Sequence, residues 1–338
     1  MTSENRHRSK RTKIMELNKK PKISGGGDVF KARLMKCKNL RFHYDLPPEE
    51  KRKFVQTEAA MNLFQSLPKE IGRILMRGFQ LGLSGQTKAG RNKVAEYFNE
   101  KSLIIPELMD NPGTYSMLER VYTSKGISGA IDSYFHSCLA GQALRNRLRA
   151  TIAYSKRHLD SLEGQLLVLN FGSGSARDTL TLSKENQHLA KRIRVDCIDI
   201  DSKANERGMR IANELGIKNH RFIERNMLKL RNEYRATADF GLLIGILCPL
   251  DTEMCIQILK IIRRYFKKGA QIISACLLQE MLERDLLCAY ILREITGWEL
   301  MFRKRGELKR MYLEAGYKWG GSFSDSPTNF YEIWIGIV

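Results

Sequence analysis

The chain has 338 residues and carries 57 Lys and Arg against 37 Asp and Glu, a formal net charge of +20. Its hydrophobic content of 43% predicts a globular protein of one large or two modest domains. The longest apolar run, residues 240–248, is too short to span a bilayer, and the N-terminus lacks the apolar segment of a secretion signal. Seven cysteines without a CxxC pair and six scattered histidines give no metal-ligand spacing, so we expect a cytoplasmic protein with reduced cysteines and no metal.

Residues 1–45 are predicted to form a flexible basic leader. They hold 13 Lys and Arg against 4 Asp and Glu, and three consecutive glycines at residues 25–27. Such a leader favours polyanions: nucleic acid, an anionic membrane surface or an acidic substrate carrier. Its charge does not distinguish among these partners, or between them and a solubilising tail.

Residues 46–150 are predicted to form an all-helical domain. Apolar residues recur at helical spacing over residues 51–67, and Pro68 ends that helix or opens the next. The apolar face of the following helix consists of Ile71, Ile74, Leu75 and Phe79. Three later predicted helices cover residues 115–122, 127–139 and 142–162. We place the domain boundary near residue 150, without a flexible linker.

The most informative stretch is LLVLNFGSGSARD, residues 166–178. Its apolar start predicts a buried parallel strand, and Gly172-Ser173-Gly174 predicts a turn where the backbone approaches a ligand closely. A second apolar strand ends on Asp199, at the separation that places a carboxylate on a ribose. Together these features predict an adenosine-binding crevice at the carboxyl ends of two adjacent parallel strands.

The pattern also discriminates among adenosine ligands. A dinucleotide fingerprint needs a third glycine three positions after the second, where this chain has Arg177. The GxxxxGK[ST] motif of P-loop proteins does not occur in the sequence. S-adenosylmethionine (SAM) carries no phosphate and needs a tight turn, a ribose carboxylate and an apolar slot for adenine. The sequence therefore favours SAM.

Nearly the whole C-terminal half resembles the class I SAM-dependent methyltransferases. The segments similar to their motifs are NFGSGSARD, CIDIDSKA, RFIERNMLKL, DFGLLIGILCP and FKKGAQIISACL. The resemblance implies an α/β, Rossmann-like, mostly parallel sheet with helices on both faces over residues 151–338. It also implies that the final strand, residues 331–338, turns back antiparallel into the sheet edge.

The resemblance further implies SAM as the cofactor, with Asp199 on the ribose. Asn226 would contact the adenine through its side chain and Met227 through its backbone N–H. The implied cofactor-binding residues are Asn170, Gly172, Ser173, Gly174, Asp199, Ile200, Asn226, Met227 and Gly245. The chain departs from the family pattern at Asn170 and Asn226, where acids are frequent, and at Ala176, which replaces a third glycine. These departures leave the glycine turn and the ribose acid intact.

A narrower resemblance concerns VYTSKGISGAIDSYFHSCLAGQALRNRL, residues 121–148. This segment is similar to the one preceding the glycine motif in bacterial methyltransferases of 3-hydroxypalmitate methyl ester biosynthesis, and the C-terminal layout is similar as well. This resemblance implies an acidic, lipid-like methyl acceptor.

The fourth motif and the candidate catalytic residues indicate which kind of atom accepts the methyl group. The fourth motif reads GILCPL and lacks the Asn/Asp-Pro-Pro-aromatic pattern used for planar amino groups, which favours an oxygen acceptor. A carboxylate is already ionised and needs no general base. Candidate catalytic residues are Tyr134 and His136, which could hydrogen-bond a substrate hydroxyl, and Arg147, which could clamp a carboxylate or the methionine end of SAM. Arg145 and Arg147 lie about 200° apart around a helix, so both cannot face one site.

Three functions follow as hypotheses. The first is a SAM-dependent methyltransferase that methylates an oxygen, carboxylate or hydroxyl, of a small-molecule or lipid-like acid such as a hydroxy fatty acid. The second is an RNA methyltransferase that uses the basic leader and the helical domain. The third is a non-catalytic SAM-binding module.

Overall fold

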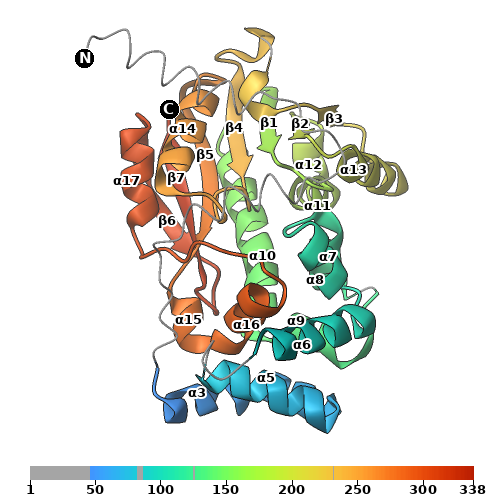
Figure 1. The fold of residues 1–338 in the computed structure, drawn as a ribbon. Helices are drawn as coiled ribbons and strands as arrows, with labels where there is room; N and C mark the ends of the chain where they lie inside the picture. Colours follow the sequence, from blue (N-terminus) through green and yellow to red (C-terminus); the bar gives the residue numbers. More distant parts are fainter. Residues whose placement is uncertain (1–45, 82–86, 125, 231) are drawn as a thin grey trace, which may run out of the picture. The chain divides into compact units, whose positions relative to one another are not determined.

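A seven-stranded sheet forms the centre of the structure, a computed structural model that describes residues 46–81, 87–124, 126–230 and 232–338 (Figure 1). The strand order is β3-β2-β1-β4-β5-β7-β6, and β7 runs opposite to the other six strands. The strands are β1 (Leu166–Phe171), β2 (Ile193–Asp199), β3 (His220–Glu224), β4 (Ala238–Leu243), β5 (Phe266–Leu277), β6 (Lys318–Ser324) and β7 (Tyr331–Ile337). This confirms the predicted Rossmann-like sheet. The last strand lies between β5 and β6, so β6 forms the edge where the final strand was expected.

Two hydrophobic cores cover the two faces of the sheet, because successive side chains of a strand point to opposite faces. Leu166 and Val168 of β1 belong to the core that includes residues of the long helix α10 (Leu139–Asp160). Leu167, Leu169 and Phe171 belong to the other core, with α14 (Thr252–Arg263) and α17 (Glu307–Glu314). Since both faces are packed, every residue of β1 is buried, as the apolar run LLVLNF predicts.

The segment before the sheet is helical, as expected, but its first helix is interrupted. The helices are α3 (Pro48–Val55), α4 (Glu58–Ser66), α5 (Lys69–Leu81), α6 (Lys88–Lys101), α7 (Ile105–Asp110), α8 (Tyr115–Thr123) and α9 (Gly129–Ser137). The single helix predicted over residues 51–67 is wrong, because Thr57 Oγ1 accepts a hydrogen bond from Ala60 N at 3.3 Å and starts α4 anew. Pro68 does separate two helices, and Ile71, Leu75 and Phe79 of α5 are buried.

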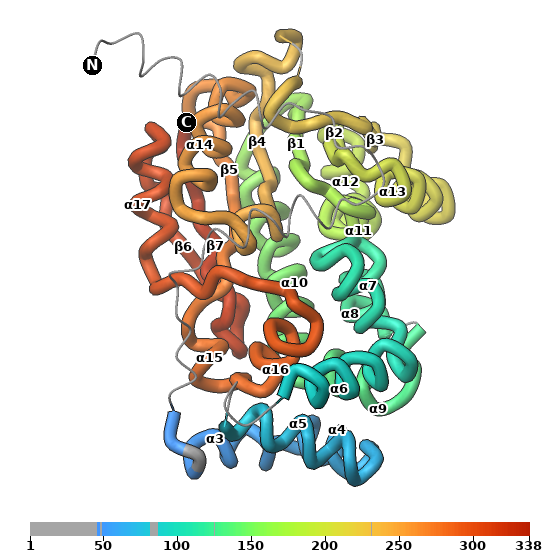
Figure 2. The backbone as a smooth tube through the Cα atoms, in the orientation of Figure 1, coloured from blue at the N-terminus to red at the C-terminus, as the bar shows by residue number. Residues whose placement is uncertain are grey.

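Helix α10 connects the helical segment to the sheet (Figure 2). It is continuous over 22 residues and packs on α8, α9, α11 (Arg177–Glu185) and β7. The boundary that we predict near residue 150 falls inside this helix. All described residues belong to one compact unit, and the predicted leader, residues 1–45, lies outside the described residues.

A second helical segment follows β5 and packs against the N-terminal helices. It consists of α15 (Glu280–Arg284), α16 (Leu286–Tyr290) and a π-helical turn over Ile291–Ile295. Helix α16 packs on α3, and the π-helical turn packs on α6. Two further helices, α12 (Gln187–Ala190) and α13 (Ser202–Glu214), contribute buried residues to the same core as α10. Within the described ranges, no helix combines the length and the apolar composition that a membrane crossing requires.

The packing of β7 against α17 gives a test of the fold. A Cβ on the buried Gly336 would overlap the ring of Tyr312, whose hydroxyl is held by Ser274 Oγ at 3.0 Å. We expect Gly336→Ala to lower the free energy of unfolding in urea by about 2 kcal/mol, the usual cost of overpacking. As the control, a Cβ on Gly72 of α5 would lie 3.8 Å from its nearest neighbour, so Gly72→Ala should gain about 0.5 kcal/mol. Equal stabilities would contradict this packing.

Candidate functional site

β1 ends in a turn whose backbone is left-handed at three positions. Gly172 has φ of +57°, Gly174 has φ of +54° and Ala176, which precedes α11, has φ of +55°. Glycine adopts this left-handed conformation without strain, whereas for alanine it is unfavourable by about 1 kcal/mol. Ala176 therefore keeps the backbone shape of the glycine that it replaces in the sequence pattern.

Asp199 at the end of β2 is hydrogen-bonded to this turn. Its Oδ2 accepts from Gly174 N at 2.8 Å, and its Oδ1 accepts from Asp201 N at 3.0 Å. Burial raises the pKa of Asp199, while these backbone hydrogen bonds act in the opposite direction. The parallel pairing of β1 with β2 brings the acid and the turn together, as predicted.

Apolar and amide groups lie in the segments that follow β2 and β3, near the strand end that carries Asp199. Ile200 is 70% exposed, and the loop after β3 is tied to the end of β2 because Arg225 N donates to the Asp199 carbonyl at 2.9 Å. In that loop Asn226 Oδ1 accepts from Leu228 N at 2.9 Å, and Met227 is half-buried. The Nδ2 group of Asn226 and the apolar surface of Ile200 and Met227 are thus the groups that this end of the sheet offers to a ligand.

The segment after β4 closes the other side of the turn. Gly245 is exposed with φ of +86°, and the Ile246 side chain occupies the space where a Cβ on Gly172 would lie. The Oγ atom of Ser173 is buried and has no hydrogen-bond partner among the described residues. An unsatisfied hydroxyl at this turn fits a polar ligand group beside the backbone.

Asn170, by contrast, does not present its amide to this space. It is 2% exposed, and its Nδ2 donates to Asp178 Oδ1 at 2.9 Å. Asp178 Oδ1 also accepts from Thr179 N at 2.8 Å. The side chain of Asn170 therefore holds the first turn of α11 in place beside the glycine turn.

Helix α8 lies over the glycine turn, which the sequence did not predict. Glu119 Oε1 accepts from Ser175 Oγ at 2.8 Å and from Arg177 Nη2 at 2.7 Å. Its Oε2 accepts from Arg207 Nη2 of α13 at 3.4 Å. On the same helix, Tyr115 Cβ would lie 3.3 Å from a Cβ on Gly174. These partners are distant in sequence, so no local pattern could identify them.

The three candidate catalytic residues lie in different surroundings. Tyr134 is buried beside Asp285, Cys288 and Cys138, and burial raises its pKa well above the usual range. Burial and the charge of Arg145 lower the pKa of His136, which is near the end of α9. Only Arg147 lies next to a residue of the crevice, because its Nη1 would be 4.0 Å from a Cβ on Gly245.

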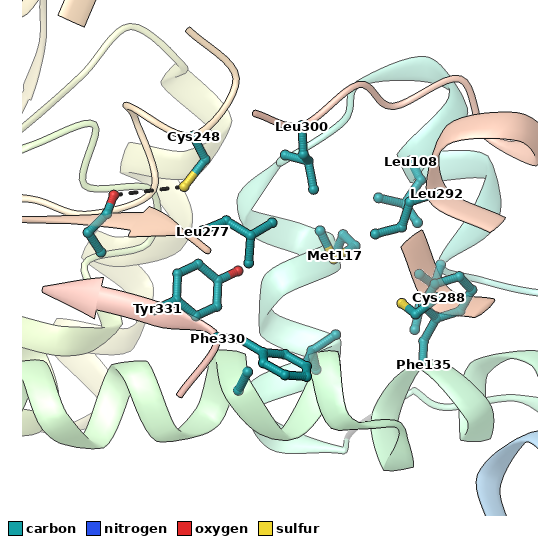
Figure 3. Packing of buried hydrophobic residues seen from close by; sticks show 14 of the residues in the cluster. Leu108, Met117, Phe135, Cys248, Leu277, Cys288, Leu292, Leu300, Phe330 and Tyr331 are labelled. Carbon is teal, nitrogen blue, oxygen red and sulfur yellow. Dashed lines mark hydrogen bonds between the residues drawn. The ribbon is translucent and has the colours of Figure 1, made fainter. Parts of the chain in front are cut away.

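Cys138, Asp285 and Cys288 form a buried group whose possible ligand atoms lie within 4.8 Å of one another. Their sequence separation explains why spacing alone predicted no metal site. Asp285 Oδ2 accepts from Ala140 N at 2.8 Å, and burial raises the pKa of Asp285 to about 6. Cys288 lies beside Phe135 in an apolar cluster (Figure 3). The group supplies three possible metal ligands, whereas a structural zinc takes four. It connects the start of α10 to α16.

No protein-family model matches the chain, and no curated protein matches it. Solved structures match it in fold. A possible exported protein from Bordetella parapertussis superposes with a TM-score of 0.63 and 16% sequence identity, covering 83% of this chain and 97% of that chain. At this identity the similarity concerns the fold.

Many of the other matching structures are SAM-dependent methyltransferases. Magnesium protoporphyrin IX methyltransferase from Synechocystis PCC 6803, with bound SAM, has a TM-score of 0.47 and 13% identity over 73% of this chain and 96% of that chain. A SAM-dependent methyltransferase from Aquifex aeolicus has a TM-score of 0.42 and 16% identity over 55% of this chain and 89% of that chain.

The Glu119 network gives a test of how α8 is held. Glu119 is 13% exposed, so Glu119→Gln removes a largely buried charge from two arginines, and we expect a loss of about 2 kcal/mol in unfolding free energy. Hydrogen exchange over residues 115–123 should accelerate in this variant. The control is Glu100→Gln, whose exposed pair with Lys101 should contribute less than about 0.5 kcal/mol. Unchanged exchange in Glu119→Gln would contradict the network.

Proposed function

We propose that the chain is a SAM-dependent methyltransferase that methylates an oxygen, carboxylate or hydroxyl, of a small-molecule or lipid-like acid. The observation that carries the proposal is the hydrogen bond from Gly174 N to Asp199 Oδ2 at 2.8 Å. It fixes a carboxylate beside a glycine-containing turn at the carboxyl ends of two adjacent parallel strands, the place where open α/β sheets bind ligands.

The residues around the turn fit the parts of SAM. Asp199 would accept hydrogen bonds from the ribose hydroxyls, and the backbone of Gly172, Ser173 and Gly174 would lie along the methionine part. The unsatisfied Ser173 Oγ supports a polar ligand group there. Asn226 Nδ2 and Met227 N–H would bind the adenine edge. When bound, SAM supplies an electrophilic methyl group on a sulfonium, and the chain positions the acceptor about 3 Å from it.

The segment after β4 supports an oxygen acceptor that is already ionised. Residues 244–249, IGILCP, contain no carboxylate or imidazole that could remove a proton. Their one titratable side chain is the buried Cys248 thiol, and burial raises its pKa. A carboxylate acceptor needs no general base, so this segment fits a carboxylate better than a neutral hydroxyl.

The basic leader adds a partner to this proposal. Its excess of Lys and Arg supports binding to an anionic membrane surface or to nucleic acid in the cytoplasm. Methyl transfer to RNA is the alternative function, and a non-catalytic SAM-binding module is the other.

Calorimetric titration with S-adenosylhomocysteine (SAH) tests the cofactor site. Asp199→Asn should weaken SAH binding by about 1.4 kcal/mol, a tenfold change, because an amide accepts hydrogen bonds less strongly than a carboxylate. Burial raises the pKa of Asp199, so wild-type affinity should be constant above that pKa and fall as pH drops through it. The affinity of Asp199→Asn should lack this fall.

The matched control for this titration is Asp160→Asn, a surface acid paired with Lys156 and His188. It should bind SAH like the wild type at every pH. A wild type that binds no SAH, or an Asp199→Asn variant with undiminished affinity, would overturn the proposed site.

A further inference from the structure

The buried side chains of Cys138, Asp285 and Cys288 converge closely enough to hold a metal ion. Their possible ligand atoms all lie within 4.8 Å of one another, and the described part of the chain holds no second group of this kind. In a tetrahedral zinc site, two thiolate sulfurs lie about 3.8 Å apart, and a sulfur and a carboxylate oxygen lie about 3.5 Å apart. The three side chains therefore need to close by about 1 Å to bind zinc.

Tyr134 brings a fourth possible ligand atom to the same place. Its side chain is 2% exposed and lies beside Asp285, Cys138 and Cys288, yet its hydroxyl makes no hydrogen bond of standard geometry. Tyr134 and Cys138 are four residues apart on one segment, and Asp285 and Cys288 are three apart on another, so each pair lies on one side of its segment. Two pairs of ligands at such short spacing are typical of structural zinc sites.

The charges of this group also favour a cation. Asp285 is buried beside two thiols and a hydroxyl, and buried charges are normally paired or bound to a metal. Ala140 N donates to Asp285 Oδ2 at 2.8 Å, as a backbone group often does to a carboxylate that binds a metal. Arg145 acts on Cys138 electrostatically, but its Nη1 donates to the Val121 carbonyl at 3.2 Å. A divalent cation would supply the positive charge that the group itself does not contain.

We propose that Cys138, Asp285 and Cys288, together with the Tyr134 hydroxyl, bind one zinc ion. Thiolates select zinc over magnesium and calcium, which take oxygen ligands. On binding, the two thiols release their protons to the solvent, the ionised carboxylate adds one oxygen, and the Tyr134 hydroxyl adds a lone pair. Two thiolates and one carboxylate then leave a single net negative charge on the site. The N-terminus of α10, which begins directly after Cys138, stabilises that charge.

The zinc ion would join two helical segments that are far apart in the sequence. Cys138 lies between α9 and α10, whereas Asp285 and Cys288 belong to the start of α16. Cys288 lies among buried apolar residues such as Phe135, so the ion would be shielded from water and would have a structural role (Figure 3). Tyr134 would then act as a zinc ligand and not as a donor to a substrate. The zinc site does not depend on the proposed methyl transfer.

The test uses the full chain, purified under reducing conditions without a metal-binding tag from cells grown with zinc. Mass spectrometry of the metal content should find about one zinc per chain, the number that one tetrahedral site holds. After a chelator has removed the zinc, titration with cobalt(II) should produce thiolate-to-cobalt charge-transfer absorption, which a site made of oxygen ligands does not give. The chelator should also lower the midpoint of thermal unfolding by about 5 °C or more, because the folded chain alone holds the ion tightly.

Three variants separate zinc binding from the packing of a buried thiol. Cys288→Ala should lower the zinc affinity by at least about 100-fold, because it removes a ligand. Cys276→Ala is the matched control, since Cys276 is also fully buried but lies in β5 outside the group, and it should keep one zinc. Tyr134→Phe keeps the ring and removes the hydroxyl, so it should lower the zinc affinity by about tenfold. Cooperative unfolding of each variant shows that it is folded.

Four results would overturn the proposal or part of it. A wild type that contains no zinc and gives no charge-transfer absorption with cobalt has no such site, whether or not the variants fold. Zinc that Cys288→Ala retains in full lies elsewhere on the chain. A disulfide between Cys138 and Cys288 that persists under reducing conditions leaves no thiolates for a metal. A Tyr134→Phe variant with undiminished zinc affinity excludes Tyr134 as the fourth ligand.

Discussion

The hydrogen bond between Gly174 N and Asp199 Oδ2 is the interaction on which the site depends. It exists because β1 and β2 are adjacent and parallel, so that a turn after one strand meets an acid at the end of the next. The left-handed backbone at Gly172 and Gly174 aims the amide at the carboxylate. Ala176 shows how strictly this shape is kept, since it adopts a left-handed conformation that disfavours a side chain.

The helical segments place charges around this bond in two contrasting ways. Glu119 of α8 is matched by Arg177 and Arg207, and it holds α8 over the glycine turn. Arg147 of α10 is more deeply buried than Glu119, and its Nη2 donates to the Tyr122 hydroxyl. The first arrangement is a structural ion pair, and the second places a buried cation against a hydroxyl and the ring of Tyr331.

Local features of the sequence predicted the sheet and the meeting of the glycine turn with Asp199, because a buried strand, a glycine turn and an acid after a strand each lie within a few residues. The position of β7 between β5 and β6 depends on strand pairing across the sheet. The break between α3 and α4 depends on one threonine, Thr57, which caps α4. Glu119 and the surroundings of Arg147 could not be predicted, because their partners lie on elements far apart in the sequence. The residue type of Tyr134 suggests a hydrogen-bond donor for a substrate, whereas the fold buries it beside Asp285.

A crystal structure of the chain soaked with SAH tests the central claim most directly. The account predicts ribose hydroxyls on the Asp199 carboxylate, the amino-acid part along Gly172–Gly174, and adenine against Ile200. Density for SAH elsewhere on the chain, or a glycine turn that stays free of SAH at saturating concentration, would contradict it.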